Sequence, residues 1–353
     1  MTNFLRCQPG DLPTGFGQAY FTTSNDFQKT FSSMKGISVI ICCYNSSSRL
    51  PETLRHLAAQ VIPDSVSCEV ILVNNASTDN TVEVAQAEWE KYSPSNIDFR
   101  IIYESRPGTS FARQKGIIEA RYAYYLFCDD DNWLNPNYLS TGFSILENDK
   151  EIGGLGGMGI PEFGGPKPDW FDKYAMYYAV GPQAPASGDI SRRRGWVYGA
   201  GCFVRKEAVE NMDHYQFITT DRKGTSLSSG GDIELCYYIL LHGYKIWYDE
   251  RLTFTHYIEG RRLSLDYIKR MLLAHAQEAY QLDGLEYKSR ANQDFNLYNK
   301  KFQRMWIFRF LFDAVKLKKA YYEEFPIKFL FKLYITRLNA ILKLNSRFDQ
   351  SFQ

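Results

Sequence analysis

Three consecutive carboxylates, Asp129, Asp130 and Asp131, end an apolar and aromatic run over residues 122–128. Such a run is typical of a strand covered on both faces of a parallel sheet, and ligands of these sheets bind beyond the carboxyl ends of the strands. Adjacent carboxylates repel one another, and a hard divalent cation such as Mg²⁺, held together with substrate phosphates, removes that repulsion. We therefore predict a metal–diphosphate site here. The alternative is a solvated acidic turn before a helix, where Asp is also favoured.

The elements that must position these acids alternate between strand and helix. Strands are predicted at residues 37–43, 68–73 and 99–103, each followed by a helix, the last of which covers residues 109–120. Alternation over about 95 residues predicts βαβ units and a parallel, doubly wound α/β sheet. Right-handed crossovers place the loops after these strands, and the acids with them, at one edge of the sheet.

Composition narrows the class of protein. The 353 residues, 44% of them hydrophobic, can bury a sizeable core, and a net charge of +1 gives no reason to expect a nucleic-acid partner. The cysteines number seven and most lie in apolar segments, which favours a reduced, cytosolic protein over a disulfide framework. The first residues lack the apolar core of a signal peptide, and no run of about 18 apolar residues occurs, so we expect a cytoplasmic protein without membrane spans.

Two other nucleotide-binding arrangements fit the sequence poorly. Residues 154–159 match the dinucleotide-binding pattern G-x-G-x-x-G, but Pro161 follows where a helix should begin. A sugar nucleotidyltransferase would need a glycine-rich loop around a triphosphate, whereas the loop after the first predicted strand begins Tyr44-Asn45-Ser46. Neither arrangement is therefore preferred.

Six motifs follow one another along the chain. They are Val39-Ile-Ile-Cys-Cys-Tyr44-Asn45, Val73-Asn-Asn-Ala-Ser-Thr-Asp79, Ser110-Phe-Ala-Arg113-Gln-Lys-Gly116, Phe127-Cys-Asp129-Asp-Asp131, Gly199-Ala-Gly201 and Gly231-Asp232-Ile-Glu234-Leu. With these motifs the chain resembles, over roughly residues 37–262, the inverting family 2 nucleotide-sugar glycosyltransferases. The resemblance implies a GT-A fold, which is a Rossmann-like, mostly parallel sheet flanked by helices.

The resemblance also implies a nucleotide site at the sheet edge. Its residues would come from the first two loops, the helix after the third strand and the acidic loop: Cys43, Tyr44, Asn45, Asn74, Asn75, Arg113, Asp129 and Asp130. Asn74 departs from the family, which usually has Asp there, and an amide can donate to a base as well as accept from it. The expected sugar donor is a nucleoside diphosphate sugar, and a UDP-sugar is the preferred candidate. The alternatives are an Asx-turn for both asparagines and a solvated helix face for Arg113.

By the same resemblance, Asp131 and His256 bind a metal, Mn²⁺ or Mg²⁺. A carboxylate and a neutral imidazole are both good ligands. Arg262 would clamp the diphosphate, for which the shape of a guanidinium is well suited, and Arg261 is the second choice for this role. The metal would neutralise charge on the leaving nucleoside diphosphate, which then needs no proton.

Asp232 occupies the family's position for the base that deprotonates the acceptor hydroxyl. The usual Glu-Asp pair is altered, because Gly231 stands where the family has Glu. The alternative is a helix N-cap formed by Asp232, with Glu234 in the first turn. Four residues are expected beside the donor sugar and the acceptor: Trp196, Gly199, Gly201 and Glu234.

We expect three regions along the chain. They are an irregular arm over residues 1–35, a catalytic domain over 36–263, with a nucleotide-binding half (36–135) and an acceptor half (136–263), and a basic, amphipathic helical extension over 264–353. In the extension, polar residues at helical spacing between residues 305 and 320, and again after Pro326, leave wide apolar faces. Such faces can pack on the catalytic domain, form the seam of a homodimer or lie on a membrane surface.

The extension also concentrates positive charge. Residues 295–353 carry twelve Lys and Arg against four Asp and Glu, a balance of about +8. Each basic residue near an anionic leaflet contributes on the order of 1 kcal/mol, and aromatic side chains add interfacial burial. Two expectations stay open: peripheral association with the inner face of the cytoplasmic membrane, where a lipid-linked acceptor would be found, and ordinary packing on the core.

The preferred function is metal-dependent, inverting transfer of a single sugar from a nucleoside diphosphate sugar to a glycan or lipid-linked acceptor, in surface polysaccharide or glycoconjugate biosynthesis. A processive synthase would show membrane spans and a Gln-x-x-Arg-Trp signature, and the sequence has neither. Two alternatives stay open: a sugar nucleotidyltransferase, and a non-catalytic sugar-nucleotide or glycan-binding protein of the same fold, to which Gly231 points.

Overall fold

The computed structural model describes residues 34–210, 230–291 and 325–348, together with positions 217, 219 and 227. The arm predicted over residues 1–35 therefore lies outside the described residues, except for its last two, which begin the first strand. The helix predicted between residues 305 and 320 also lies outside them.

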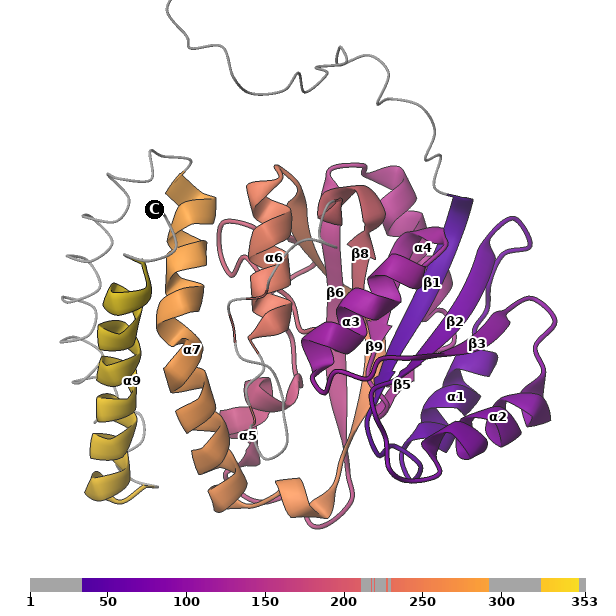
Figure 1. Ribbon diagram of the computed structural model, residues 1–353. Helices are drawn as coiled ribbons and strands as arrows, with labels where there is room; N and C mark the ends of the chain where they lie inside the picture. The colour runs from indigo at the N-terminus through magenta and orange to yellow at the C-terminus, as the bar shows by residue number, and fades with distance from the viewer. Residues whose placement is uncertain are drawn as a thin grey trace, which may run out of the picture. The chain divides into compact units, whose positions relative to one another are not determined.

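A mixed sheet of nine strands forms the centre of the described chain (Figure 1). Its order is β3-β2-β1-β4-β8-β6-β9-β5, and β7 pairs with β9 beside this path. The strands are β1 (Met34–Cys43), β2 (Ser67–Asn74), β3 (Asp98–Tyr103), β4 (Tyr122–Cys128), β5 (Asn132–Leu134), β6 (Ile152–Phe163), β7 (Gly188–Asp189), β8 (Cys202–Arg205) and β9 (Lys245–Ile258). The first four pair in parallel, as the sequence predicts, and β8 then joins β4 antiparallel.

Side chains of the parallel strands alternate between two hydrophobic layers. In β1, Ile37, Val39 and Ile41 belong to one layer, whereas Ile40 belongs to the other. The alternation follows from the pleat of the strand. Both layers are apolar because helices cover both faces of the sheet. This is why the predicted strands are mainly apolar on both faces.

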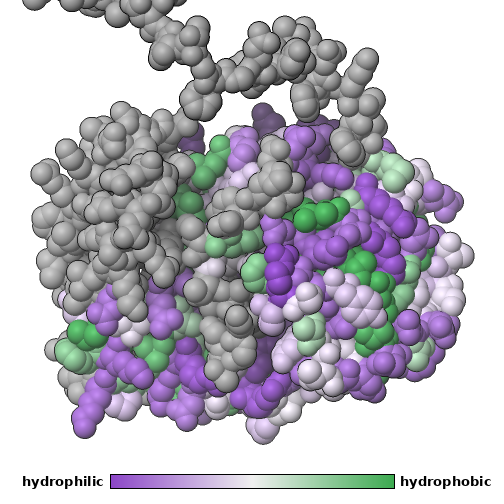
Figure 2. Space-filling view, in the orientation of Figure 1, coloured by the Kyte–Doolittle hydropathy of each residue, from purple (hydrophilic) through white to green (hydrophobic). Residues whose placement is uncertain are grey.

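Helices complete the two layers. The first layer contains α1 (Leu50–Ala58), α2 (Thr81–Tyr92) and α4 (Tyr138–Asn148), and the second contains α3 (Thr109–Glu119) and α6 (Gly231–Leu241). Short helical turns follow at α5 (Phe171–Tyr174), η1 (Ala175–Tyr178), η2 (Lys206–Val209) and η4 (Gly260–Arg262). On the side of α1, α2 and α3, small hydrophobic areas are interspersed among hydrophilic residues (Figure 2).

The glycine-rich run over residues 154–159 lies inside β6. A Cβ atom at Gly157 would stand 1.9 Å from the carbonyl oxygen of Leu252, so glycine is what allows β6 to approach its parallel partner β9 here. The run is therefore part of a strand, in agreement with the rejection of a dinucleotide-binding loop.

The last described helices are α7 (Leu265–Ala291) and α9 (Ile327–Phe348). A third hydrophobic cluster joins them to α5 and η1 and includes Tyr178, Leu272 and Leu333. The described helices of the predicted extension thus pack on the sheet-bearing part of the chain.

α9 begins at Ile327, which confirms the helix predicted after Pro326. Leu330 and Leu333 are buried, whereas Phe331 is 67% exposed, so one aromatic side chain of α9 faces away from the cluster. In the parts of the chain that the structure describes, no helix has both the length and the apolarity needed to cross a bilayer.

Candidate active site

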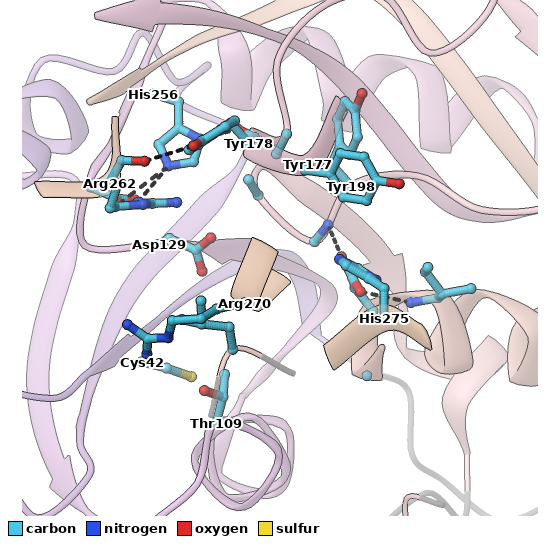
Figure 3. Close-up of a pocket in the computed structure, with 18 of the residues that line it drawn as sticks. Cys42, Thr109, Asp129, Tyr177, Tyr178, Tyr198, His256, Arg262, Arg270 and His275 are labelled. Carbon is cyan, nitrogen blue, oxygen red and sulfur yellow. Dashed lines mark hydrogen bonds and ion pairs between the residues drawn. The ribbon is translucent and has the colours of Figure 1, made fainter. Parts of the chain in front are cut away.

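A cavity of about 1180 Å³ opens where β1, β2 and β4 end (Figure 3). Its walls come from the loops after these strands, from α3 and α6, and from the segments β9, η4 and α7. The predicted site residues that line it are Tyr44, Asn45, Asn75, Arg113, Asp129, Asp130, Asp131, Trp196, Gly199, Asp232, His256 and Arg262. Residues far apart in the sequence therefore meet in one place, as the parallel topology requires.

The acidic loop turns sharply after β4. The Asn132 side chain accepts a hydrogen bond from the Asp129 N–H at 3.1 Å, and the Asn132 N–H donates to the Asp129 carbonyl, also at 3.1 Å. β5 then pairs antiparallel with β9, which sets Asn132 opposite His256. Asp131 is thereby brought to His256, with 3.4 Å between its Oδ2 and the Nε2 of the ring. Asp129, in contrast, faces the open cavity (Figure 3).

Asp131 and His256 have the chemistry of a metal site. The Nδ1 of His256 lies 2.6 Å from the Tyr178 carbonyl, which can only accept, so Nδ1 carries a proton, and Nε2 is the ring nitrogen that points to Asp131 and is available to a metal. A carboxylate and an imidazole fit Mn²⁺, and the carboxylate fits Mg²⁺. Among the described residues no group of three or more His, Cys, Asp or Glu is placed to hold an ion, so further ligands would be substrate oxygens or water.

Positive neighbours keep Asp131 ionised. Burial raises the pKa of its carboxyl, but His256 and Arg262 outweigh burial and hold that pKa well below its usual range. Asp130 behaves differently, because burial and the charge of Asp131 raise its pKa and Arg49 only partly offsets them. Of the two neighbouring acids, Asp131 is therefore the one better prepared to bind a cation.

Arg262 lies at the same point. Its Nη1 is 3.0 Å from Asp131 Oδ2 and 3.5 Å from His256 Nε2. The rings of Tyr178 and Tyr267 both lie 5.7 Å from its guanidinium carbon. The side chain is 12% exposed, and its Nε is buried without a hydrogen-bond partner among the described residues. A donor is thus left for an anionic oxygen, which supports Arg262 as the diphosphate clamp.

Arg261 is less suited to that role. Its side chain is 76% exposed and forms an ion pair with Glu259. A solvated cation that is already paired contributes little binding energy. The position of the two side chains therefore favours Arg262.

Asp232 lies in the first turn of α6 and lines the cavity. Its Oδ2 accepts a hydrogen bond from the Gly199 N–H at 2.9 Å, and its Oδ1 accepts one from the Ile233 N–H at 3.0 Å. The N-cap is Gly230 and no side chain caps the helix, so the capping alternative for Asp232 is wrong. A Cβ atom at Gly199 would lie 2.8 Å from Arg113 Nη2 and 2.9 Å from Asp232 Cβ, which places Gly199 between these two side chains.

Gly231, the departure from the family, also lines the cavity. A Cβ atom there would lie 3.5 Å from Ser110 Oγ and 4.0 Å from Arg113 Nη1, which are ordinary contacts. Packing does not require glycine at this position. The chain therefore has room beside Asp232 where the family has a Glu side chain.

Asn75 holds the loop that leads to α3. Its Nδ2 donates to the carbonyls of Glu104 and Arg106 at 3.0 and 2.7 Å, and its Oδ1 accepts from the Gly108 N–H at 2.8 Å. The amide that was expected to meet the nucleoside is thus used within the protein. Asn75 forms part of the cavity wall and fixes its shape.

Two predicted nucleotide-binding residues do not line the cavity. Cys43 is fully buried in the first hydrophobic layer, and Cys42 lines the cavity instead, because adjacent residues of a strand point to opposite faces. Asn74 is buried, and its Oδ1 accepts from the Ser77 N–H at 3.1 Å, a bond within its own loop that resembles the Asx-turn alternative but reaches three residues on instead of two. Both assignments are therefore corrected.

Tyr44 and Asn45 form the loop after β1. Tyr44 is exposed at the cavity. Asn45 has a φ of 49°, in the left-handed region that Asn tolerates, and its Oδ1 accepts from the Thr78 N–H at 2.8 Å. The first loop is thereby tied to the loop after β2.

Gly201 and Glu234 also do not line the cavity, contrary to the prediction. Gly201 has a φ of 68°, and a Cβ atom there would lie 2.4 Å from the Tyr138 hydroxyl. Glu234 is fully buried and accepts hydrogen bonds from the Thr219 N–H at 2.9 Å and from its hydroxyl at 2.6 Å. Residues two apart on a helix point about 200° away from each other, so Asp232 and Glu234 cannot face one cavity.

Trp196 lines the cavity as predicted. The guanidinium carbon of Arg194 lies 3.6 Å from the Trp196 ring and 4.7 Å from the ring of Tyr198, which also lines the cavity. The stacked arginine fixes both rings from behind. They form an aromatic wall next to Gly199, of the kind that suits a sugar ring.

Sequence reasoning missed other lining residues, among them Cys42, Thr109, Tyr177, Arg270 and His275, all labelled in Figure 3. Arg270 comes from α7, and its side chain extends across the cavity towards Cys42. A lone arginine on an amphipathic helix is usually solvated, so no motif distinguishes it. The available signal was helical spacing, because Tyr267 and Arg270 share one face of α7.

Comparison with known sequences shows a match to one family over part of the chain. The pattern of glycosyl transferase family 2 matches residues 38–184. The glycosyltransferase YibD of Escherichia coli (strain K12) is 31% identical over 122 residues, which are 34% of this chain and 33% of the relative. The chain spans between 28% and 33% of the length of the first curated relatives that it matches.

Solved structures show the same fold. Mannosyltransferase PcManGT from Pyrobaculum calidifontis, in complex with GDP-Man and Mn²⁺, has a TM-score of 0.51 at 15% identity and covers 91% of this chain and 79% of its own. Residues 1–349 of S. aureus TarS, in complex with UDP-GlcNAc, have a TM-score of 0.50 at 17% identity and cover 90% of this chain and 93% of that one. Residues 38–184 of the chain are thus similar to glycosyl transferase family 2, and the chain has the GT-A fold.

Proposed function

We propose that the protein is a metal-dependent, inverting glycosyltransferase that moves one sugar from a nucleoside diphosphate sugar to a hydroxyl of a glycan or lipid-linked acceptor. One observation carries the proposal. The ionised Asp131, the Nε2 of His256 and the guanidinium of Arg262 converge within one cavity that Asp232 also lines. A cation site, an anion clamp and a candidate base in one cavity are the parts that this reaction needs.

The donor end of the cavity would be the edge of the sheet. Asp131 and His256 would hold Mn²⁺ or Mg²⁺, which when bound acts as a Lewis acid on the diphosphate. The Arg262 guanidinium would bind the diphosphate oxygens, and Tyr44 and Asn45 would border the nucleoside. Structures of this fold bind UDP-GlcNAc and GDP-Man, and we propose a UDP-sugar as the first donor to test.

Asp232 would take the proton of the acceptor hydroxyl. Hydrogen bonds from Gly199 and Ile233 orient the carboxylate and leave lone pairs on both oxygens for a substrate proton. A base on the acceptor and a leaving group that needs no proton fit one in-line displacement. The product should then have the anomeric configuration opposite to that of the donor, which NMR of the first-formed product measures.

The experiment that tests the proposal identifies the sugar donor and does not require the acceptor to be known. A panel of UDP-, GDP- and dTDP-sugars is incubated with the protein and Mn²⁺, and slow hydrolysis is followed by release of the nucleoside diphosphate. We expect one donor class to be hydrolysed in the presence of metal, and we expect neither donor binding nor hydrolysis from Asp131→Ala. Binding without any turnover would favour a sugar-nucleotide-binding protein, and pyrophosphate-dependent exchange would favour a nucleotidyltransferase.

For the cellular setting we propose surface polysaccharide or glycoconjugate biosynthesis on the cytoplasmic side of the membrane, with a lipid-linked acceptor. The supporting feature is the outer side of α9, where Phe331, Lys328 and Lys332 are exposed together. An aromatic side chain between two lysines suits an anionic lipid surface.

A further inference from the structure

Arg49, in the loop between β1 and α1, connects three segments around the proposed metal site. Its Nη2 lies 2.5 Å from Asp130 Oδ2, and its Nη1 lies 3.0 Å from Glu259 Oε1. The side chains of Arg49, Asp130 and Glu259 are 16%, 13% and 18% exposed, so these ion pairs are largely removed from water. Desolvation of such pairs offsets most of their attraction, so stability alone is a weak reason for them.

Each partner of Arg49 belongs to a loop that carries a site residue. Asp130 precedes Asp131 in the acidic loop. Glu259 opens the turn η4, and its carbonyl accepts the Arg262 N–H at 2.8 Å. Arg49 thus joins the loop of the metal-binding acid to the turn of the diphosphate clamp.

The acidic loop is held on the same side by a second contact. The Thr53 hydroxyl on α1 donates to the Asp130 carbonyl at 2.9 Å. The backbone and the carboxylate of Asp130 are therefore both bound by the start of α1. This arrangement turns Asp130 towards Arg49, while Asp131 meets His256 and Arg262.

We propose that Arg49 is a positioning residue of the metal–diphosphate site. By binding Asp130 and Glu259 together, it keeps Asp130 from replacing Asp131 as a metal ligand and holds Arg262 at the point where the diphosphate binds. The inference rests on the proposed metal-dependent binding of a nucleoside diphosphate, because it concerns how that site is built.

Two substitutions disrupt the ion pairs that Arg49 forms with Asp130 and Glu259. Arg49→Lys keeps the charge, but one ammonium group cannot reproduce the two-sided geometry of the guanidinium. Glu259→Gln keeps the shape of the second partner and removes its charge. The matched control is Arg55→Lys, because Arg55 lies on α1, is exposed and contacts its helix neighbours Glu52 and His56.

The measurements are calorimetric titrations of the full chain with Mn²⁺ alone and with UDP at saturating Mn²⁺, and thermal unfolding without ligand. We expect Arg49→Lys and Glu259→Gln each to weaken UDP binding by about tenfold or more, and Arg55→Lys to leave it unchanged. Because both substitutions act through one link, the double variant should bind UDP no more weakly than the worse single variant.

A purely structural role predicts a different pattern. The melting temperature would fall, while the affinities for Mn²⁺ and UDP, measured well below that temperature, would equal those of the wild type; this result would overturn the inference. If Arg49→Lys does not fold, Arg49→Met combined with Asp130→Asn removes the buried charges of that pair together, and this variant should fold and still bind UDP weakly. A wild-type protein that binds neither UDP nor GDP with Mn²⁺ would instead remove the proposed function itself.

Discussion

The carboxylate of Asp232 and the backbone N–H of Gly199 form a 2.9 Å hydrogen bond that ties the first turn of α6 to the segment before β8. The other carboxylate oxygen accepts the Ile233 N–H at 3.0 Å. Two backbone donors therefore fix the orientation of the proposed base before any acceptor binds. A base that is already oriented loses little entropy when the reaction begins.

Asp232→Asn should separate donor binding from transfer. The amide oxygen of Asn can still accept the Gly199 N–H, and only the bond from the Ile233 N–H is lost, so we expect the fold and the donor end to be retained. Transfer should fall by about 10²–10⁴-fold, because proton removal by a side chain contributes that much. The measurements are kcat for transfer and the Kd for UDP. Near-complete transfer by this variant would show that another group is the base.

Gly199→Ala should lower transfer by about tenfold or more. The new Cβ atom would meet Arg113 Nη2 at 2.8 Å, and this flexible side chain can move, but it would also meet Asp232 Cβ at 2.9 Å, which is fixed to α6. Relieving that contact displaces the base, and overpacking of this kind costs about 1–3 kcal/mol of folding free energy.

The matched control for this substitution is Gly231→Ala. Its Cβ atom would make only an ordinary contact, 3.5 Å from Ser110 Oγ, and Ala is favoured over Gly within a helix. Urea unfolding and transfer rates of the two variants are compared. Equal activity of Gly199→Ala and the wild type would mean that the position of Asp232 tolerates displacement.

Glu147 gives the fold a dependence on pH away from the cavity. It accepts hydrogen bonds from the Tyr124 hydroxyl at 2.5 Å and from Lys150 Nζ at 2.9 Å, and Lys35 Nζ lies 3.0 Å away. Burial raises the pKa of Glu147, but these donors outweigh burial and lower the pKa to about 2. A carboxyl group with a lowered pKa stabilises the folded state above its unfolded pKa of about 4.3, and this contribution is lost as the pH falls towards 2.

Glu147→Gln should therefore lower the free energy of unfolding by on the order of 1 kcal/mol at neutral pH, a value reduced for solvent screening. The loss should shrink as the pH falls below about 4. Denaturant unfolding of both proteins at neutral and at acidic pH measures the difference. A loss that is the same at every pH would assign it to packing and not to charge.

Two neighbouring residues of α9 test what its helical face does. Leu330 is 8% exposed and belongs to the third hydrophobic cluster, whereas Phe331 is 67% exposed. Leu330→Asp should destabilise the fold by about 2–5 kcal/mol, because it removes a core side chain and buries a charge. Phe331→Asp should leave the melting temperature within a few degrees of the wild type.

Liposome flotation then tests whether the outer surface of α9 contacts lipid or faces bulk solvent. Phe331→Asp should reduce flotation with anionic liposomes if α9 contacts lipid, and neutral liposomes serve as the control for charge. If the wild-type chain binds neither kind of liposome, the membrane proposal is wrong. A concentration-dependent change of mass that Phe331→Asp abolishes would indicate a dimer seam.

The strands were predictable because their cause is local. Residues 37–43, apolar except for Ser38, and the apolar residues 122–128 form β1 and β4, since helices cover both faces of the sheet. The location of the three acids at the edge of the sheet was predictable from their position directly after β4. The sequence predicted less well which side of a strand or helix faces the cavity. Cys42 and Cys43 are adjacent in one strand and point to opposite faces of the sheet, and only Cys42 lines the cavity. Glu234 shares a motif with Asp232 but points away from the cavity.

Contacts between distant segments were beyond sequence reasoning. Arg49 and Glu259 are 210 positions apart, and neither belongs to a motif of the resemblance. Arg270 lines the cavity only because α7 packs back on η1 through the third hydrophobic cluster. Such relationships depend on how β9 and α7 return to the sheet, which no local pattern encodes.

Tyr178 takes part in the proposed metal site and in the hydrophobic cluster at the same time. Its carbonyl accepts from His256 Nδ1 at 2.6 Å, its hydroxyl donates to the Arg262 carbonyl at 2.7 Å, and its ring lies in the cluster with Leu272 of α7 and Leu333 of α9. Thermodynamic linkage between two such events is reciprocal. If an ion that fixes His256 slows hydrogen exchange in α7 and α9, then loosening those helices must weaken the binding of the ion by the same factor.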